Sequence, residues 1–433
     1  MPGAEAHGRM VKSTKTLSRF ALALALAALP DRARADSNFR PYVVGARAAG
    51  MGGAFTALAD DGSGPFYNPG GVAFVTRSQL SLSGSVYGIV GGTLEDALDD
   101  GNDFTYRNLN VFPSTTAGVW KLGEPEATSA SVLAFSVLVP DAIDVDDRDA
   151  IGSSDNAFFF SNEVQTVWAG LTYARRMGRI GVGATGFFLL GTRLSQLDLT
   201  VATGANQFNT VTSRIDESTY GFVGALGARW DVTDHLHLGA SVYSPAMGGG
   251  SRRVFARIGT AQEGQAPQIA ADHADGLHAS PSDPLRAQMG VAWSSGALTA
   301  AADGIWLGPR TVTDDAGQPF QRRIVREAVV NGAIGLEYVF ADRYPLRAGF
   351  FTDFSASKNP PDPNVGNTSH IDRLGGTFSI GYRTEHTSSD LGVNVSGGSG
   401  RNVVPNNLDF SQPRLTRSSQ LLVYLFLGTS YQF

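Results

Sequence analysis

Apolar and polar residues alternate along most of the chain from residue 78 onward. Within 285–293, every second residue from Leu285 to Trp293 is apolar, and the residues between them are arginine, glutamine, glycine and alanine. The last segment, 421–433, has Leu, Val, Leu, Leu, Thr, Tyr and Phe in one phase. A period of two is that of a β-strand with one apolar face. The pattern predicts a long series of strands of about ten residues each.

The spacing of these strands predicts how they are connected. Short turns join some runs, as at 230–238 and 338–346, whereas long polar segments separate others. These long segments, expected to be loops, are 89–108, 140–156, 262–282, 311–326, 358–372 and 398–413. Short turns at one end and long loops at the other are typical of an outer-membrane barrel. A soluble β-sandwich also alternates, but its apolar faces would point into a core.

The strand count favours an all-β fold, a transmembrane antiparallel β-barrel of about 14 strands. Residues 195–203 and 250–260 are expected to extend two strands beyond the membrane. The fourteen expected strands lie near 78–88, 113–122, 128–139, 162–176, 179–193, 215–231, 235–247, 283–295, 297–309, 327–341, 344–356, 373–384, 387–397 and 419–433.

Charged residues in the inner phase of the strands are expected to face the lumen. Two interpretations remain open for them: ion pairs that brace the wall, or an arginine that holds a substrate carboxylate. All five tryptophans fall within expected strands, where they form interfacial girdles or stack on carbohydrate. The expected lumen residues are Arg229, Arg286, Asp303, Glu337, Arg347 and Asp353.

The N-terminus has the features of a secretory signal peptide. Basic residues precede an apolar stretch at 20–29, and Ala33-Arg34-Ala35 forms a cleavage site, so the mature chain is expected to begin at Asp36. Translation from Met10 instead of Met1 would leave this signal intact. The sequence therefore predicts export and a place in the bacterial outer membrane.

Composition narrows the chemistry. The chain has no cysteine, which excludes disulfides and thiolate catalysis. Charged residues make up 17% of the chain, against about 25% in average soluble proteins. The net charge of −6 argues against a nucleic-acid partner.

The sequence also lacks the usual motifs of metal sites. The acidic loop 141–149 lacks the spacing of a calcium loop, and no histidine pair has zinc-ligand spacing. Without a nucleophile elbow, we expect neither an enzyme nor a bound metal or cofactor.

A glycine-rich segment, 45–71, stands between the signal and the first strand. It lacks the lysine of a phosphate loop and follows no strand. Met51, Phe55 and Leu58 have helical spacing up to Asp60. We expect residues 36–77 to form a short, partly helical hatch inside a barrel of residues 78–433. The residues expected to pack it against the wall are Gly50, Gly52, Gly53 and Phe55.

Residues 58–73, Leu-Ala-Asp-Asp-Gly-Ser-Gly-Pro-Phe-Tyr-Asn-Pro-Gly-Gly-Val-Ala, resemble the N-terminal hatch of the FadL-like long-chain fatty-acid outer-membrane transporters. Asn68 and Pro69 match the Asn-Pro-Ala triplet of that hatch, and Gly70 replaces its alanine, a change expected to be sterically small. The resemblance implies a fourteen-stranded barrel plugged by the hatch. It also implies passive uptake of small hydrophobic molecules, such as fatty acids or aromatic hydrocarbons, with gating at Phe66, Tyr67, Asn68, Pro69 and Gly70.

Other roles remain open for particular residues. Phe158, Phe159 and Phe160 are expected at the outer end of a strand, where they form a capture groove or face lipid. Tyr431 and Phe433 resemble the C-terminal signal read by the barrel-assembly machinery. Expected partners are therefore that machinery, outer-membrane lipid and lipopolysaccharide, and a small hydrophobic ligand. A docking role for secreted proteins and a structural barrel without transport are the alternatives.

Overall fold

The computed structural model describes residues 38, 43–97, 101–110, 115–123, 129–149, 157–204, 207–261, 264, 266–362, 369–404 and 414–433. The signal peptide, its cleavage site after Ala35 and the start codon lie outside the described residues. The same holds for most side chains of the acidic segment 141–155 and for the side chain of Phe158.

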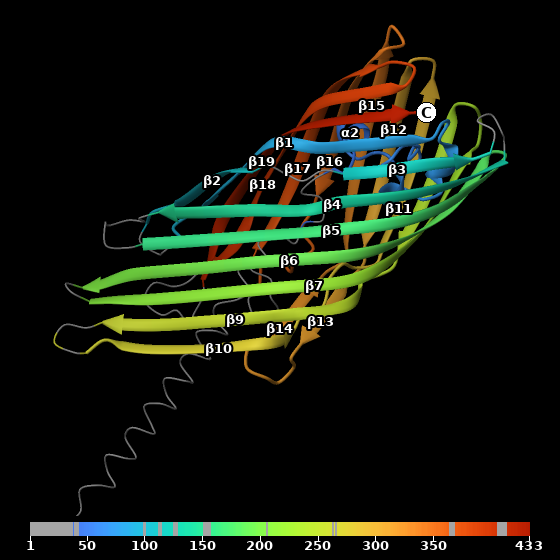
Figure 1. Cartoon of the computed structure of the whole chain (residues 1–433). Coiled ribbons are helices and arrows are strands. Elements are labelled where there is room, and N and C mark those ends of the chain that lie inside the picture. Colours follow the sequence, from blue (N-terminus) through green and yellow to red (C-terminus); the bar gives the residue numbers. More distant parts are fainter. Residues whose placement is uncertain are drawn as a thin grey trace, which may run out of the picture.

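Seventeen strands form one antiparallel sheet, which closes because β1 pairs with β19 along its whole length. Figure 1 shows this seam, where blue β1 runs beside red β19. The sheet comprises β1 Gln79–Leu94, β2 Phe104–Asn110, β3 Thr115–Leu122, β4 Ser129–Asp149, β5 Ala157–Met177, β6 Ile180–Gly204, β7 Gln207–Asp231, β8 Leu236–Tyr243, β9 Met247–Ala261, β10 Gln268–His278, β11 Arg286–Ser295, β12 Leu298–Leu307, β15 Val329–Phe340, β16 Tyr344–Asp353, β17 Ser369–Arg383, β18 Thr387–Val404 and β19 Arg414–Gln432.

We call each position around the barrel a stave, whether one strand or two occupy it. Two strands that follow each other along the same direction occupy three of the staves: β2 with β3, β8 with β9, and β10 with β11. The seventeen strands therefore make a barrel of fourteen staves, which confirms the predicted fold class. Both expected extensions, 195–203 and 250–260, are in strands, within β6 and β9. The antiparallel ladder satisfies the backbone polar groups of each stave, as a lipid environment requires.

The prediction of long irregular loops was partly wrong. Strand β4 continues to Asp149, β18 continues to Val404, and β10 occupies much of 262–282. Polar residues can extend a strand where both faces of the sheet are hydrated. Strands β4 to β10 consequently form a wall that projects well beyond the rest of the barrel (Figure 1). The expected loop 311–326 contains most of a separate hairpin, β13 Arg310–Asp314 with β14 Arg322–Arg326.

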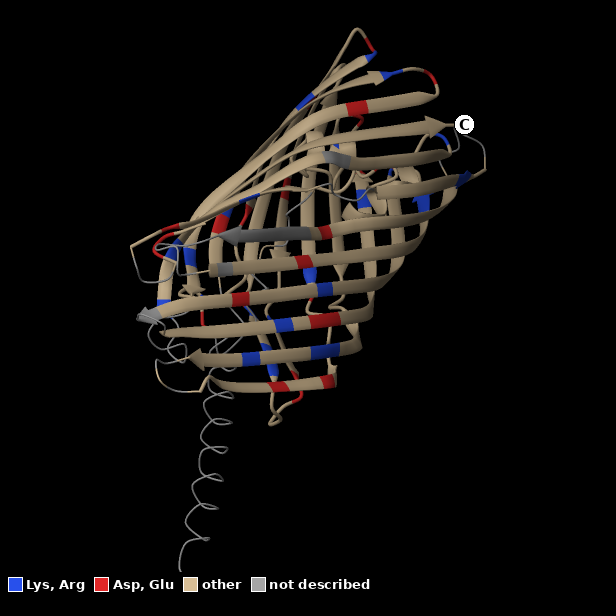
Figure 2. Ribbon diagram, turned by 60° about the vertical axis from the view of Figure 1, so that its left-hand side comes forward, with Lys and Arg blue, Asp and Glu red and all other residues tan. Residues whose placement is uncertain are grey.

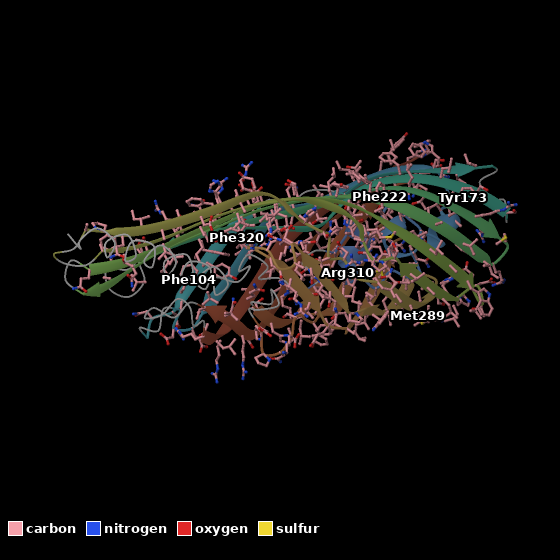
Figure 3. The ribbon with its side chains drawn as sticks, turned by 90° about the horizontal axis from the view of Figure 1, so that it is seen from below. Phe104, Tyr173, Phe222, Met289, Arg310 and Phe320 are labelled. Atoms are coloured by element: carbon pink, nitrogen blue, oxygen red, sulfur yellow. The ribbon has the colours of Figure 1, made fainter. Side chains whose placement is uncertain are left out.

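Outward and inward side chains follow the predicted alternation. Tyr173, Phe222 and Met289 are exposed on the outer surface (Figure 3). Charged residues occur along many of the barrel strands (Figure 2), and those buried in the lumen include Arg229, Asp303, Glu337 and Arg347. Four tryptophans point outward, whereas Trp168 is 7% exposed and points into the lumen. No helix in the described part of the chain is long and apolar enough to cross a membrane.

The segment before β1 lies inside the barrel as three short helices: α2 Ala46–Gly50, α3 Gly64–Tyr67 and the 3-10 helix η1 Gly71–Phe74. The expected helical run from Met51 to Leu58 was wrong, because α2 ends at Gly50. Gly52 and Gly53 have φ of 63° and 81°, a backbone conformation that breaks the helix. The apolar side chains of this run pack individually against the wall instead.

Candidate functional site

The described part of the hatch, residues 38 and 43–77, is held by polar groups of the lumen wall. Asp303 on β12 accepts hydrogen bonds from the backbone N–H groups of Phe55 and Thr56, at 2.9 and 2.8 Å. Arg229 on β7 donates to the Leu58 carbonyl at 2.6 Å. These bonds satisfy backbone groups that a short irregular segment cannot satisfy by itself.

Arg286 on β11 contacts the hatch both by a hydrogen bond and by stacking on aromatic rings. Its guanidinium donates to the Phe66 carbonyl at 3.1 Å and lies over the rings of Phe66 and Tyr243, at 4.6 and 3.6 Å from their centroids. Tyr243 itself donates to the same carbonyl at 2.6 Å. The arginine is therefore occupied by hatch and wall groups in this structure.

Ion pairs link the hatch to the opposite wall. Arg47 on α2 contacts Asp60 of the hatch at 2.7 Å and Glu337 on β15 at 3.1 Å. Arg347 on β16 contacts Glu337 and Asp390 on β18, each at 2.6 Å. Burial acts to raise the pKa of Asp60, but nearby guanidiniums, chiefly that of Arg47, outweigh it and hold this pKa below its usual value. The carboxylate therefore stays charged and paired.

All six expected lumen residues lie inside the barrel; Arg286 is half-buried, and the other five are 7% exposed or less. Arg229, Arg286, Asp303 and Glu337 contact the hatch directly. Arg347 reaches it through Glu337. Asp353 pairs with Arg373 on β17 at 2.6 Å, in a second cluster that is higher in the lumen.

The Asn-Pro-Gly triplet is fixed against β7. The Asn68 side-chain amide donates to the carbonyls of Thr56 and Ala228, at 2.9 and 2.8 Å, and its oxygen accepts from the Gly70 N–H at 3.0 Å. A Cβ at Gly70 would lie 2.6 Å from both the Ala228 Cα and the Gly227 oxygen. The expectation that this departure from alanine is sterically small was therefore wrong, because the backbones are in contact there.

Of the other expected packing glycines, Gly50 and Gly52 face the wall at close range, whereas Gly53 lines a cavity. A Cβ on Gly50 would contact Ser379 and Arg347, and one on Gly52 would lie 2.9 Å from the Phe350 nitrogen. Phe55 is fully buried in the core that hatch and wall share. The glycines of the wall are the counterpart: added Cβ atoms on Gly183, Gly227, Gly239, Gly335 and Gly349 would all overlap the hatch backbone.

Two adjoining cavities lie above the hatch, toward the long-strand end of the barrel. The upper cavity, of about 210 Å³, is lined by apolar side chains including Phe104, Phe160 and Leu422, together with polar groups on β6 and β7. The hatch cavity, of about 120 Å³, lies between hatch residues Phe66 and Tyr67 and wall residues. Both cavities are lined by Asp141, Thr166, Asp283 and Arg326, which mark the neck between them.

The three expected capture phenylalanines are placed differently. Phe160 lines the upper cavity. Phe159 is half-buried on the opposite face of β5, and the side chain of Phe158 lies outside the description. Alternation along β5 separates neighbouring residues onto two faces, so Phe159 and Phe160 do not line one surface; a capture role stays a prediction for Phe160.

Several residues of the site were missed from the sequence. Trp168 lies 6.0 Å from Phe66 and 5.2 Å from Phe187, ring centroid to centroid, in the hatch cavity. Its position in the inner phase of β5, with Val164 and Thr166, was the available signal. No local pattern in the sequence marked Arg47 as a site residue, because its partner Glu337 is 290 residues away.

A Ser-His-Asp grouping occurs at the start of β17, and its geometry does not suit catalysis. His370 Nδ1 lies 3.5 Å from Ser357 Oγ, and its Nε2 lies 3.7 Å from Asp372. The Ser357 hydroxyl is buried and donates instead to the Ser369 carbonyl. In the part of the chain that is described, no three His, Asp or Glu residues are placed to hold a metal ion.

Solved structures share this architecture. A Pseudomonas aeruginosa FadL homologue matches with a TM-score of 0.63 and 14% identity, over 92% of this chain and 100% of that one. The Pseudomonas putida toluene transporter TodX matches with a TM-score of 0.64 and 14% identity, over 91% and 99%. The Ralstonia pickettii toluene transporter TbuX matches with 0.55 and 13%, over 90% and 98%. No family model and no curated protein sequence matches. The resemblance seen in the hatch sequence is confirmed at the level of the fold.

Proposed function

We propose that this protein is an outer-membrane channel through which small hydrophobic molecules, such as fatty acids or aromatic hydrocarbons, diffuse passively. The main support is the pair of apolar-lined cavities in a lumen that the hatch closes. Cavities of this kind hold apolar ligands and use a few polar groups to orient them. The names of the similar structures, a FadL homologue and toluene transporters, support the same class of ligand.

The proposed path begins in the upper cavity and passes the neck at Thr166 and Arg326 into the hatch cavity. A ligand there would contact the aromatic rings of Phe66, Tyr67 and Trp168. Burial of its apolar surface supplies the affinity, at about 25 cal/mol per Å².

We further propose that the hatch gates the path beyond this cavity. Movement at Asn68–Gly70 requires the Asn68 amide to release the Thr56 and Ala228 carbonyls. Each such hydrogen bond contributes about 1 kcal/mol, so a local opening is energetically accessible without unfolding of the barrel.

The neck provides the sharpest test. Thr166 points into the lumen, whereas its neighbour Val167 lies on the outer face of β5. Thr166→Trp is expected to lower uptake of labelled palmitate or toluene at least about tenfold, because the indole fills the neck. The matched control Val167→Trp should transport normally, at equal amounts of folded barrel in the outer membrane.

Equal uptake by both variants and the wild type would contradict the proposed path. Mass spectrometry of molecules that co-purify in mild detergent gives a second readout, in which repeated absence of an apolar ligand would count against transport. Co-purification with a secreted protein, with no effect of the barrel on uptake, would instead support the docking alternative. A barrel that neither changes uptake nor co-purifies with a ligand or a secreted protein would support a structural role.

A further inference from the structure

The outer surface at the barrel seam changes from apolar to basic over a few residues. Strands β18, β19, β1 and β2 are neighbours there in that order (Figure 1). Residues directly opposite one another in these ladders share a face. The last fully apolar row across the four strands consists of Val395, Val423, Ile89 and Leu109.

Above this row the outward surface becomes progressively more polar. The next outward row, two residues further along each strand, contains Gly397, Leu421, Gly91 and Arg107. The row after that consists of Ser399, Ser419, Thr93 and Thr105. The Thr93 and Thr105 hydroxyls lie 3.3 Å apart. Small and hydroxyl side chains in this order leave room for a polar group that lies against the strands.

Two arginines face each other at the next level. Arg401 on β18 is directly opposite Arg417 on β19, and both are exposed. Like charges directly opposite in a sheet repel and destabilise it. Among the described residues no carboxylate lies within 4.0 Å of either guanidinium; Glu95 is next to Arg417 but interacts with it only through its backbone N–H. On β17, the other neighbour of β18, the residue opposite Arg401 is His370.

We propose that this surface binds the phosphorylated headgroup of a glycolipid of the outer leaflet. Arg401 and Arg417 together hold a phosphate, whose charge relieves their repulsion and whose oxygens match the guanidinium fork. The hydroxyl row contacts the sugars, and the acyl chains lie along the apolar rows below. The long-strand end of the barrel faces outward, because short turns mark the periplasmic rim. The site is independent of the proposed transport.

The height of the arginine pair favours a glycolipid over a phospholipid. Arg401 and Arg417 lie six residues beyond Val395 and Val423, about 20 Å along the strands. A phospholipid phosphate lies at the edge of the hydrocarbon, close to the level of Arg107. Two basic levels, separated by a row of hydroxyls, suit a sugar headgroup that carries two phosphates.

Native mass spectrometry in mild detergent tests the site. The probes are a diphosphorylated lipid A, its monophosphorylated form and phosphatidylglycerol, added to delipidated protein. The wild type is expected to bind the diphosphorylated glycolipid most tightly, and the double variant Arg401→Gln/Arg417→Gln should bind it at least about tenfold more weakly. Arg323→Gln, which removes an exposed arginine from the β14 hairpin, should bind as the wild type does.

Thermal unfolding distinguishes a ligand site from a merely structural pair. Without glycolipid, the double variant should unfold at the same temperature as the wild type or higher, because the repulsion is removed. With the diphosphorylated glycolipid present, the wild type should gain more stability than the variant. Equal glycolipid binding by the two proteins would overturn the proposal, and so would tighter binding of phosphatidylglycerol by the wild type. Neither outcome would affect the transport proposal.

Discussion

At the scale of single residues, close backbone contact determines which side chains the hatch tolerates. Gly70 stands where the related hatches carry alanine, and it lies against the backbone of Gly227 and Ala228. Two chain segments at this distance leave no volume for a methyl group. The residue therefore has a packing role, in addition to any part that the triplet plays in gating.

Gly70→Ala is expected to loosen the hatch. The added Cβ forces a backbone shift, for which overpacking costs of about 1–3 kcal/mol are typical. Hydrogen exchange of the amides in 45–77 should accelerate accordingly. Gly186→Ala is the control, because nothing lies within 4 Å of an added Cβ there. The steric account fails if exchange in the hatch is the same for both variants.

Asp303 supports the hatch through its charge and its hydrogen bonds. Asp303→Ala would leave the buried N–H groups of Phe55 and Thr56 without this acceptor, and each such group costs about 1–3 kcal/mol. The exchange of these two amides should become at least about tenfold faster. Thr299→Ala, on the same strand but distant from Phe55 and Thr56, should leave their exchange unaltered. Unchanged exchange in Asp303→Ala would show that other groups hold this segment.

At the scale of elements, the hatch is a compact segment that depends on the wall. Its three helices have four or five residues each, too short to be stable alone. Their stability comes from wall side chains and from wall glycines that admit the hatch backbone. The proposed gating therefore requires a local release from the wall.

A disulfide between hatch and wall tests whether that release is needed. A Cβ on Gly62 would lie 3.1 Å from the Ala117 Cβ on β3, near the separation of about 3.8 Å that disulfides favour. The chain has no cysteine of its own, so Gly62→Cys/Ala117→Cys forms one defined bridge. Uptake should fall in the oxidised protein and return with reductant. The reduced double variant and the two single variants control for the overlap of a Gly62 Cβ with the Ser81 side chain, whose Cβ and Oγ would lie 2.8 and 2.7 Å away. Full uptake by the bridged protein would contradict a moving hatch.

At the scale of the whole molecule, closure of the barrel brings both ends of the sheet together. Strand β19 pairs with β1, and the Phe433 N–H donates to the Ser78 carbonyl at 3.0 Å. The rings of Tyr431 and Phe433 lie side by side on the outer face, 6.4 Å apart. Both side chains are exposed on the outer face of the closed barrel, where an assembly partner can reach them.

Phe433→Ala should therefore impair assembly more than stability. We expect several-fold less folded barrel in the outer membrane. The purified variant should unfold close to the wild-type temperature, because the ring is 55% exposed. Gln432→Ala, which keeps the backbone bond to His386, should assemble normally. Equal amounts of folded Phe433→Ala and wild type in the membrane would exclude the signal role.

Much of this architecture was predictable because it depends on local periodicity. A period of two identified the strands, the lumen charges and the outward aromatic residues, since a strand places alternate residues on opposite faces. The boundaries of the expected loops were wrong, because polar residues outside the membrane extend a strand as readily as they form a loop. The cavity position of Trp168 was not predicted, because tryptophan is suited both to an interfacial girdle and to a cavity wall.

The sequence by itself determined the barrel, its approximate strand number and a hatch ahead of it, because each depends on residues close together in the chain. Only the tertiary structure decided what holds the hatch and where the cavities lie. The partners Phe55 and Asp303 are 248 residues apart, and Arg47 and Glu337 are 290 apart. Such pairs meet because the barrel closes around the segment, and no local pattern of apolar and polar residues specifies them.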